Sequence, residues 1–183
     1  MKIPFAAYAD DCTVTGGVAL EMDRLSDFLA STTELQIEGA AFRALDDGRV
    51  VEAESASVLM DDLCVIAATG PRGKLERRLW TRQFPVRVRV GPYTVVGYLH
   101  APPTIDPFKS ADRRMILPLT SSVVEYTVSG EVTRDRADAV LLNRQRIDLL
   151  VQADETELGL ASSPEVTMPV DPRAKDMTGD LFG

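Results

Sequence analysis

The chain is poor in the residues that most often build active sites and disulfide frameworks. Its 183 residues include two cysteines, Cys12 and Cys64, one histidine, His100, and one tryptophan, Trp80. We expect both cysteines to be small core residues of a reduced protein rather than a disulfide. One histidine and two distant cysteines cannot make a standard zinc site without acidic ligands. The composition therefore predicts no metal site and no cofactor.

Long apolar runs are also missing. No run approaches the ~18 residues that a membrane-spanning helix needs. The start, MKIPFAAYADD, has one lysine and a short apolar stretch that meets two aspartates too early for the core of a secretory signal. We therefore expect a cytoplasmic protein that does not contact a membrane. Arginine outnumbers lysine, and alanine, valine and aspartate are plentiful, which indicates a GC-rich bacterial genome.

Catalytic motifs are absent as well. The chain has no Gly-x-Ser-x-Gly, P-loop or Gly-x-Gly-x-x-Gly motif. Any Ser-His-Asp or Cys-His site would have to use His100, with an acid such as Asp106 or Asp112. The simpler interpretation is a partly exposed histidine at a strand end, hydrogen-bonded to backbone. We predict a protein that is not an enzyme, with the His100 site as an open alternative.

The letters YADD, residues 8–11, match the Tyr-x-Asp-Asp turn that holds two magnesium ions in reverse transcriptases. A polymerase palm needs a further carboxylate well upstream, but only nine residues precede Asp10 and none is acidic. Aspartate is a common turn former, so we interpret Asp10–Asp11 as a turn. The aspartate pairs at 46–47 and 61–62 also coincide with predicted hairpin turns.

The sequence repeats one pattern at an offset of 81 to 84 residues. The runs CTVTGGVAL (12–20) and YTVVGYLHA (93–101) both read as strands, with Gly16 and Gly97 in the same place. Further matched runs end in turns at Gly48 and Gly130 or are split by polar turns; they lie at 35–49 with 116–131 and at 56–68 with 138–151. We infer an internal duplication.

A short helix is predicted after the first strand of each repeat. The two helices centre on Phe28 and Phe108, for which we expect equivalent buried places. Asp23 can cap the first helix. Thr104 or Asp106 can cap the second, in which Pro107 suits the first turn.

These patterns predict a mainly β protein made of two internally duplicated antiparallel units, each a small barrel or sandwich with one short helix. A unit of about 60 residues buries little surface alone, so the two should share a core. The predicted organisation is a first β repeat (1–68), a basic connector (69–83), a second β repeat (84–151) and a disordered acidic tail (152–183).

The second repeat resembles an uncharacterised bacterial domain of unknown function. The shared pattern is a Gly-x-Leu-His-x-Pro-Pro run, a short helix, a Leu-Pro-Leu-Thr strand and a closing Asn-Arg strand. Here these elements read VGYLHAPP (96–103), LPLT (117–120) and LLNRQRIDLL (141–150). The likeness covers about residues 93–151 and implies a fold unit without a known reaction.

Charge divides the chain unevenly. Residues 1–67 carry 13 acidic and 4 basic side chains, residues 68–151 carry 8 and 14, and residues 152–183 carry 7 and 2. The basic residues are densest at 72–90, where Arg77, Arg78, Trp80 and Arg82 form a candidate partner-binding group. This stretch is interpreted as a solvated connector with Trp80 in the core, as a pairing surface for acidic chain, or as a nucleic-acid surface with Trp80 available for stacking.

The end of the chain, KDMTGDLFG, places Leu181 and Phe182 among acids and glycines. Exposed apolar residues gain nothing without a partner, so this end is a candidate docking motif. We expect a protein partner or self-association, through charge-complementary halves and this tail. The predicted function is thus an interaction or scaffold module. An RNA or anionic-ligand binder that uses the connector and second repeat is the alternative.

Overall fold

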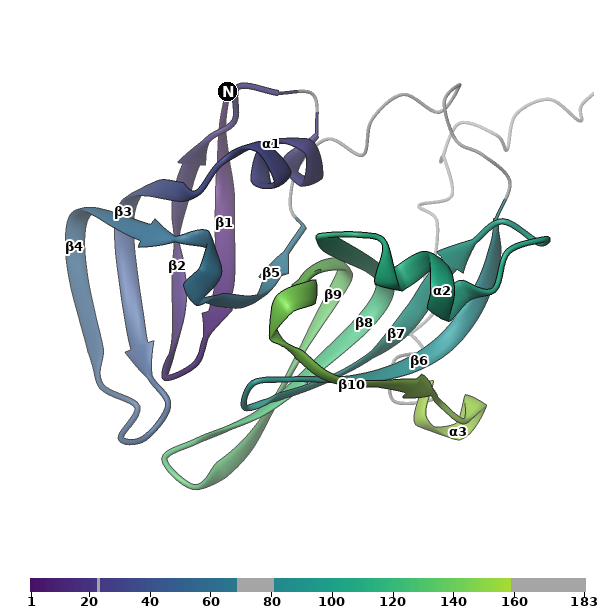
Figure 1. The fold of residues 1–183 in the computed structure, drawn as a ribbon. Coiled ribbons are helices and arrows are strands. Elements are labelled where there is room, and N and C mark those ends of the chain that lie inside the picture. Colours follow the sequence, from purple (N-terminus) through teal and green to yellow (C-terminus); the bar gives the residue numbers. More distant parts are fainter. Residues whose placement is uncertain (23, 69–80, 159–183) are drawn as a thin grey trace, which may run out of the picture.

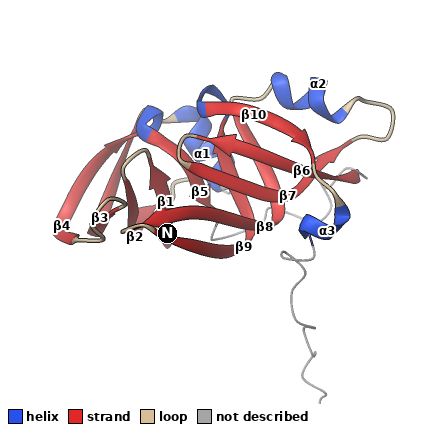
Figure 2. Cartoon of the chain, turned by 90° about the horizontal axis from the view of Figure 1, so that it is seen from below, coloured by secondary structure: helices blue, strands red, loops and turns tan. Residues whose placement is uncertain are grey.

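The computed structural model describes residues 1–22, 24–68 and 81–158 of the chain. Most of these residues lie in β-strands, drawn red in Figure 2. The expectation of a mainly β, antiparallel protein with short helices is confirmed. No helix among the described residues is long and apolar enough to cross a membrane. Both cysteines are free.

The first half has five strands, one α-helix and one 3-10 turn. In chain order they are β1 (Lys2–Ala9), β2 (Cys12–Ala19), α1 (Leu25–Ser31), β3 (Glu34–Ala44), β4 (Val50–Leu59), η1 (Met60–Asp62) and β5 (Leu63–Ala67). The sequence pattern predicts no strand before Cys12. It misses β1 because alanine and proline, four of its eight residues, are poor strand formers.

The second half follows the same order and adds a last short helix. Its elements are β6 (Arg82–Val90), β7 (Tyr93–Ala101), α2 (Pro107–Asp112), β8 (Ile116–Val128), β9 (Glu131–Asn143), η3 (Arg144–Arg146), β10 (Ile147–Gln152) and α3 (Glu155–Leu158). Each half thus runs strand, strand, helix, strand, strand, 3-10 turn, strand.

All ten strands form one antiparallel sheet in the order β10-β6-β7-β8-β9-β5-β1-β2-β3-β4. Within each half the order is the same: fifth, first, second, third, fourth strand. The halves join where β5 pairs with β9, so that Val65 lies opposite Leu142 and Ala67 opposite Val140. Figure 1 shows the purple-to-blue first half beside the teal-to-green second half. A barrel or sandwich in each half stays a prediction.

Each half has an irregularity at the same glycine. The register of β2 against β3 shifts at Gly16, and that of β7 against β8 shifts at Gly97. A Cβ on Gly16 would lie 2.5 Å from Ile37 Cγ2, and one on Gly97 would lie 2.6 Å from Ser122 Oγ. The neighbouring strand comes so close that glycine is required at both places.

Two clusters of buried apolar side chains form the core, one in each half. The clusters exchange residues across the joint. Tyr8, Cys64 and Val65 of the first half belong to the cluster of the second, and Leu141 of the second half belongs to that of the first. The structure thus has two clusters in place of the single shared core that was expected, and each half completes its cluster with side chains from the other.

The helices lie on the rims of these clusters. Phe28 and Phe108 are half-buried, each against the cluster of its own half, so the prediction that they are buried is wrong. In α1 the buried residues are Leu25 and Leu29, and in α2 the buried residue is Ala111. A helix of two turns or less that rests on a sheet leaves one side of its central residue in solvent.

A predicted N-cap is present in one of the two helices, α2. The Asp106 carboxylate accepts a hydrogen bond of 2.9 Å from the backbone N–H of Phe108, and Pro107 stands in the first turn, as expected. In α1 the N-cap residue is Arg24, which makes no side-chain cap. Asp23 lies outside the described residues.

The acidic tail begins with ordered structure. Gln152 is the last residue of β10, and α3 follows it. The backbone N–H of Ala153 donates to the Pro85 carbonyl oxygen at 3.0 Å. Figure 2 shows α2 and α3 on opposite sides of β6 and β7. The prediction of disorder is therefore wrong for residues 152–158, and residues 159–183 lie outside the described part of the chain.

Candidate binding surface

The face of the second half that points away from its core carries two cross-strand rows of side chains. From β6 to β9 they read Arg87, Val96, Val123, Arg136 and Arg89, Thr94, Glu125, Arg134. Residues two apart on a strand share a face, so the alternation that buries Val86, Val88 and Val90 turns the arginines of β6 outward. We call this surface the arginine-framed face, because an arginine stands at both ends of each row.

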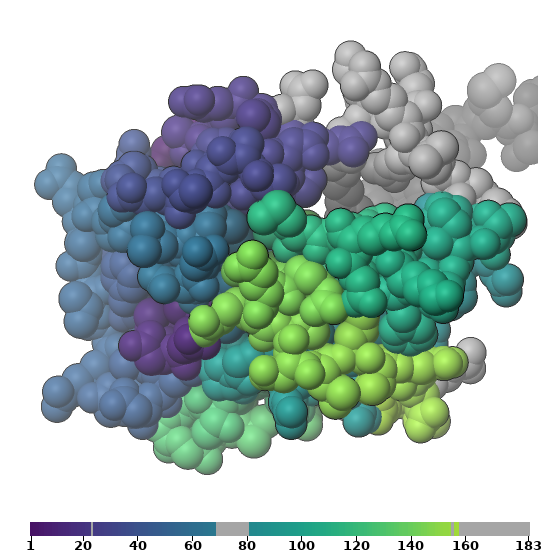
Figure 3. Space-filling model, in the orientation of Figure 1, coloured from purple at the N-terminus to yellow at the C-terminus, as the bar shows by residue number. Residues whose placement is uncertain are grey.

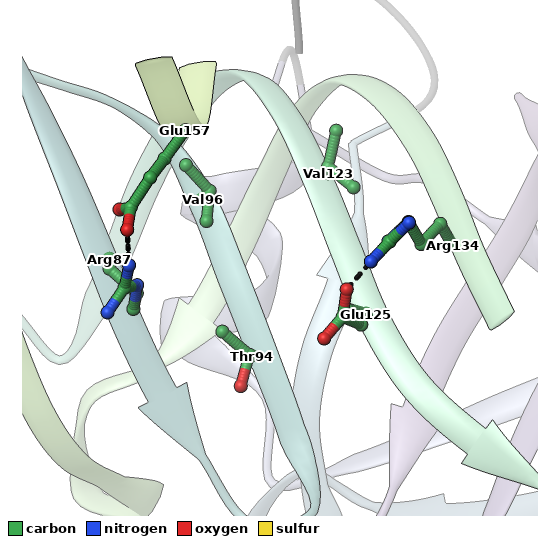
Figure 4. A pocket seen from close by; sticks show the side chains of 7 residues that line it. All are labelled: Arg87, Thr94, Val96, Val123, Glu125, Arg134 and Glu157. Atoms are coloured by element: carbon green, nitrogen blue, oxygen red, sulfur yellow. Dashed lines mark hydrogen bonds and ion pairs between the residues drawn. The ribbon is translucent and has the colours of Figure 1, made fainter. Parts of the chain in front are cut away.

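A pocket of about 350 Å³ lies on the arginine-framed face beside α3. Its lining residues are Arg87, Thr94, Val96, Val123, Glu125, Arg134 and Glu157. Figure 4 shows the two valines between an ion pair on either side. Val123 packs there with Val96 and Tyr98 in a small apolar cluster separate from the core. The pocket thus combines an apolar floor with charged walls.

Two ion pairs form those walls. The Arg87 guanidinium pairs with the Glu157 carboxylate, and Arg134 Nε lies 2.6 Å from Glu125 Oε2. Glu157 Oε2 is buried and has no hydrogen-bond partner among the described residues. Ion pairs this accessible to solvent contribute only about 0–1 kcal/mol. The Arg87–Glu157 pair, with side chains 44% and 28% exposed, therefore contributes little to stability.

The face retains excess positive charge. Arg89 and Arg136 are exposed and form no ion pair with another described residue. Four arginines thus stand against two glutamates on this surface. Such an excess attracts anionic groups.

Three tyrosines meet where the halves join. The rings of Tyr8, Tyr93 and Tyr126 have centroids 5.4 to 5.6 Å apart. Tyr8 and Tyr126 both donate to Asp135 Oδ2, at 2.9 and 2.7 Å. Burial, with the neighbouring Asp135 carboxylate, raises the pKa of Tyr8 and Tyr126 far above its ordinary value. These hydroxyls stay protonated donors, which is the chemistry of a structural network.

His100 forms no hydrogen bond or ion pair with an acid among the described residues. Its Nδ1 lies 3.2 Å from Thr81 Oγ1 and its Nε2 lies 2.7 Å from Thr120 Oγ1, so side chains rather than backbone hold it. Burial, and then the charge of Arg114, lowers the pKa of His100. The two candidate acids are engaged elsewhere: Asp106 caps α2 and Asp112 pairs with Arg144 at 2.5 Å. In the part of the chain that the structure describes, His100 has no aspartate partner of the kind that general base catalysis uses.

Asp10–Asp11 and Asp46–Asp47 lie in turns between paired strands, as predicted. Asp61–Asp62 instead belongs to η1, between β4 and β5, which do not pair with each other, so the hairpin turn predicted there is wrong. Asp10–Asp11 connects β1 to β2, and Asp10 pairs with Arg146 and accepts the Cys64 thiol at 3.4 Å. Burial chiefly raises the pKa of Cys64 to about 11, so this thiol is unreactive near neutral pH. Among residues 1–22, 24–68 and 81–158, no group of three or more His, Cys, Asp or Glu side chains is placed to hold a metal.

Of the predicted partner-binding residues, the structure describes Arg82, which is exposed at the start of β6 opposite Ala101. The others, Arg77, Arg78, Trp80, Leu181 and Phe182, lie outside the described residues. The arginine-framed face itself was not predicted. Its signal is the alternation of arginine in VRVRV (86–90) and in TRDRAD (133–138), which face one another only once the sheet is assembled.

Comparison with protein-family models, with curated proteins and with solved structures gives no match to this chain. The resemblance of the second repeat to an uncharacterised bacterial domain therefore stays a prediction.

Proposed function

We propose that this chain is a non-enzymatic interaction module of the bacterial cytoplasm that docks acidic protein segments on its arginine-framed face. The observation that carries the proposal is the Arg87–Glu157 ion pair, in which an acidic segment of the chain itself rests on that face. The occupant is a partner protein of a larger assembly, or the acidic chain of another copy.

The chemistry of the pocket supports an acidic peptide. Arginine binds carboxylates in a planar, two-pronged geometry. Arg89 and Arg136 have no ion-pair partner among the described residues and can bind a carboxylate. The apolar floor at Val96 and Val123 accepts an apolar side chain next to that acid. The short run ETEL of α3 has this mixed character.

Internal duplication, as part of the same proposal, explains the scaffold. The same element order, the same strand neighbours and the same glycine irregularity support descent of both halves from one unit. Only the second half acquired the basic surface: residues 1–67 have a net charge of −9 and residues 68–151 of +6. The bacterial and cytoplasmic setting is supported by the arginine-rich composition and by two free thiols.

The test uses a labelled peptide with the sequence of residues 152–160. Its binding to the full chain is measured by the fluorescence anisotropy of the label. Glu157→Gln removes the internal competitor and should tighten binding by about three- to tenfold. Arg87→Glu should abolish binding, and added salt should weaken it.

Arg49→Glu is the matched control, since Arg49 is an exposed arginine of the first half beside Asp47. It should leave the affinity unchanged. Equal losses in Arg49→Glu and Arg87→Glu would reduce the interaction to nonspecific charge attraction and contradict the proposal.

An RNA or anionic-ligand binder is the second candidate, favoured by the four arginines and by Tyr98, half-buried beside the apolar floor. Stacked bases and phosphates suit such a surface. An oligouridylate of about ten nucleotides is the probe. Salt-dependent binding of this RNA that is lost in Arg87→Glu and Arg134→Glu, without peptide binding, would establish this candidate instead.

A further inference from the structure

The ten-stranded sheet ends in two strands that have one hydrogen-bonded neighbour each among the described strands, β4 and β10. Figure 1 shows β4 at one flank of the molecule, and Figure 3 shows the yellow-green β10 region at the surface away from it. Both strands expose large apolar side chains, including Leu59 on β4 and Leu149 on β10. Exposed strand edges are templates for pairing with another chain.

The chain already contains one joint between such strands. The fifth strand of the first half, β5, pairs with the fourth strand of the second half, β9. In this joint Val65 of β5 is fully buried and belongs to the core cluster of the other half. A fifth strand thus completes the core of the unit that follows it.

β10 is the counterpart of β5 in register. In the pairing of β5 with β1, Leu63 lies opposite Ala9 and Val65 lies opposite Tyr8, so one residue of β5 between them has no partner. In the pairing of β10 with β6, Ile147 lies opposite Val90 and Leu149 lies opposite Arg89, so one residue of β10 between them has no partner. Leu149 therefore stands where Val65 stands, yet it is 44% exposed.

β4 is the counterpart of β9. Each follows a turn with a glycine at positive φ, Gly48 or Gly130, pairs with the strand before it and ends at a 3-10 turn. The edge of β9 that receives β5 thus corresponds to the edge of β4 that has no strand beside it among the described residues.

We infer that β10 of one copy pairs antiparallel with β4 of a second copy and repeats the β5–β9 joint. The 3-10 turns of the two halves begin at Met60 and Arg144, and this separation relates each residue of one half to its counterpart in the other. The internal pairs Val65–Leu142 and Ala67–Val140 then correspond to Leu149 opposite Val58 and Val151 opposite Ala56. Leu149 then enters the core of the first half of the next copy. This inference rests on the strand edges and not on peptide binding, although Leu149 lies opposite Arg89 of the arginine-framed face.

Charge favours this head-to-tail pairing over the pairing of two identical edges. β4 carries Glu52 and Glu54, so two β4 edges would bring like charges together. β10 itself carries one acid, Asp148, but it follows Arg144 and Arg146 and lies beside the arginines of β6. The acidic half of one copy thus meets the basic half of another.

The joint between copies is weaker than the internal one. Inside the chain, Asn143 Nδ2 donates to the Met60 carbonyl oxygen and Arg146 pairs with Asp10. The counterparts of Asn143 and Asp10 are Leu59 and Gly91, which have no side-chain group for such bonds. Association is therefore reversible and depends on concentration. Because the two edges differ, it produces either a closed ring or an open chain of copies.

Paired cysteines in the full chain test the register. Residues directly opposite in an antiparallel pair are close enough for a disulfide, so Val58→Cys with Leu149→Cys should give cross-linked multiples of 20.0 kDa on mild oxidation. Glu54→Cys with Leu149→Cys is the control. It moves the thiol four residues along β4, about 13 Å, and should cross-link about tenfold less. Equal cross-linking of the two variants would overturn the register.

Light scattering from about 10 µM to about 1 mM tests the association itself. The mass should rise above 20.0 kDa in the native chain, stay at the monomer in Leu149→Asp, and rise normally in Val132→Asp, which alters a valine on β9 that is more exposed than Leu149. A monomer at every concentration, or association lost on deletion of residues 159–183 but not in Leu149→Asp, would overturn the inference.

Discussion

The Tyr93 hydroxyl donates a hydrogen bond of 2.5 Å to the carbonyl oxygen of Ala9, across the joint between the two halves. Tyr93 is fully buried, and its ring packs edge-on against Tyr8. The bond connects the end of β1 in the first half to the start of β7 in the second half. Its loss therefore measures its contribution to the contact between the halves.

Tyr93→Phe removes this hydroxyl and leaves a buried carbonyl without its donor. We expect the free energy of unfolding in urea to fall by about 1–3 kcal/mol. Tyr98→Phe is the control, because Tyr98 is half-buried on the outer face and its hydroxyl makes no hydrogen bond to a described residue. A fall as large in Tyr98→Phe would show that the joint is not the cause.

Gly16→Ala tests the close approach of β3 to β2. The added Cβ would lie 2.5 Å from Ile37 Cγ2 and 3.0 Å from the Glu38 carbonyl oxygen, and the backbone atom cannot swing away. We expect a loss of about 1–3 kcal/mol. In Gly17→Ala the Cβ meets only the flexible Lys2 side chain, so thermal unfolding of that neighbouring variant should change little.

Helix α1 should depend more on Leu29 than on Phe28. Leu29 is 2% exposed, and Leu29→Ala should cost about 2–5 kcal/mol. Phe28 is half-buried, so Phe28→Ala should cost less, about 1–2 kcal/mol. Chemical denaturation of the two variants side by side gives the order, and a larger cost for Phe28→Ala would contradict this placement of the helix.

Stability should fall at alkaline pH. Burial raises the pKa of Tyr8, Tyr93 and Tyr126 above the unfolded value of about 10. Their contribution is complete below about pH 10 and declines as the pH rises further, because the unfolded chain then releases protons that the folded chain retains. Urea unfolding between about pH 9 and about pH 11.5 measures the slope. Tyr126→Phe should make the slope shallower, and an unchanged slope would contradict the assignment.

How much of the fold is predictable depends on the range of the interaction. The turns at Asp10–Asp11, Gly48 and Gly130, and the cap at Asp106, are correctly predicted because each is decided by a few adjacent residues. Strand β1 is missed because its alanines and proline have low strand propensity and tertiary pairing overrides it.

The arginine-framed face could not be predicted from adjacent residues. Arg87 and Arg134 belong to the same face only because β6, β7, β8 and β9 assemble in register. Glu157, which pairs with Arg87, comes from α3, seventy residues later in the chain. His100 shows the opposite case, in which the nearby acids of the sequence, Asp106 and Asp112, are turned to other partners.

By itself, the sequence determined a mainly β chain with short helices, its turns, the repeated pattern and the contrast in charge between the halves. These follow from local propensity, period-two alternation and composition, which need no knowledge of distant neighbours. The tertiary structure alone decided the β5–β9 joint, the burial of Val65 in the other half, the exposure of Leu149 and the arginine-framed face. Each of these depends on which strands pair and in what register, and the favourable pairing is a property of the whole sheet.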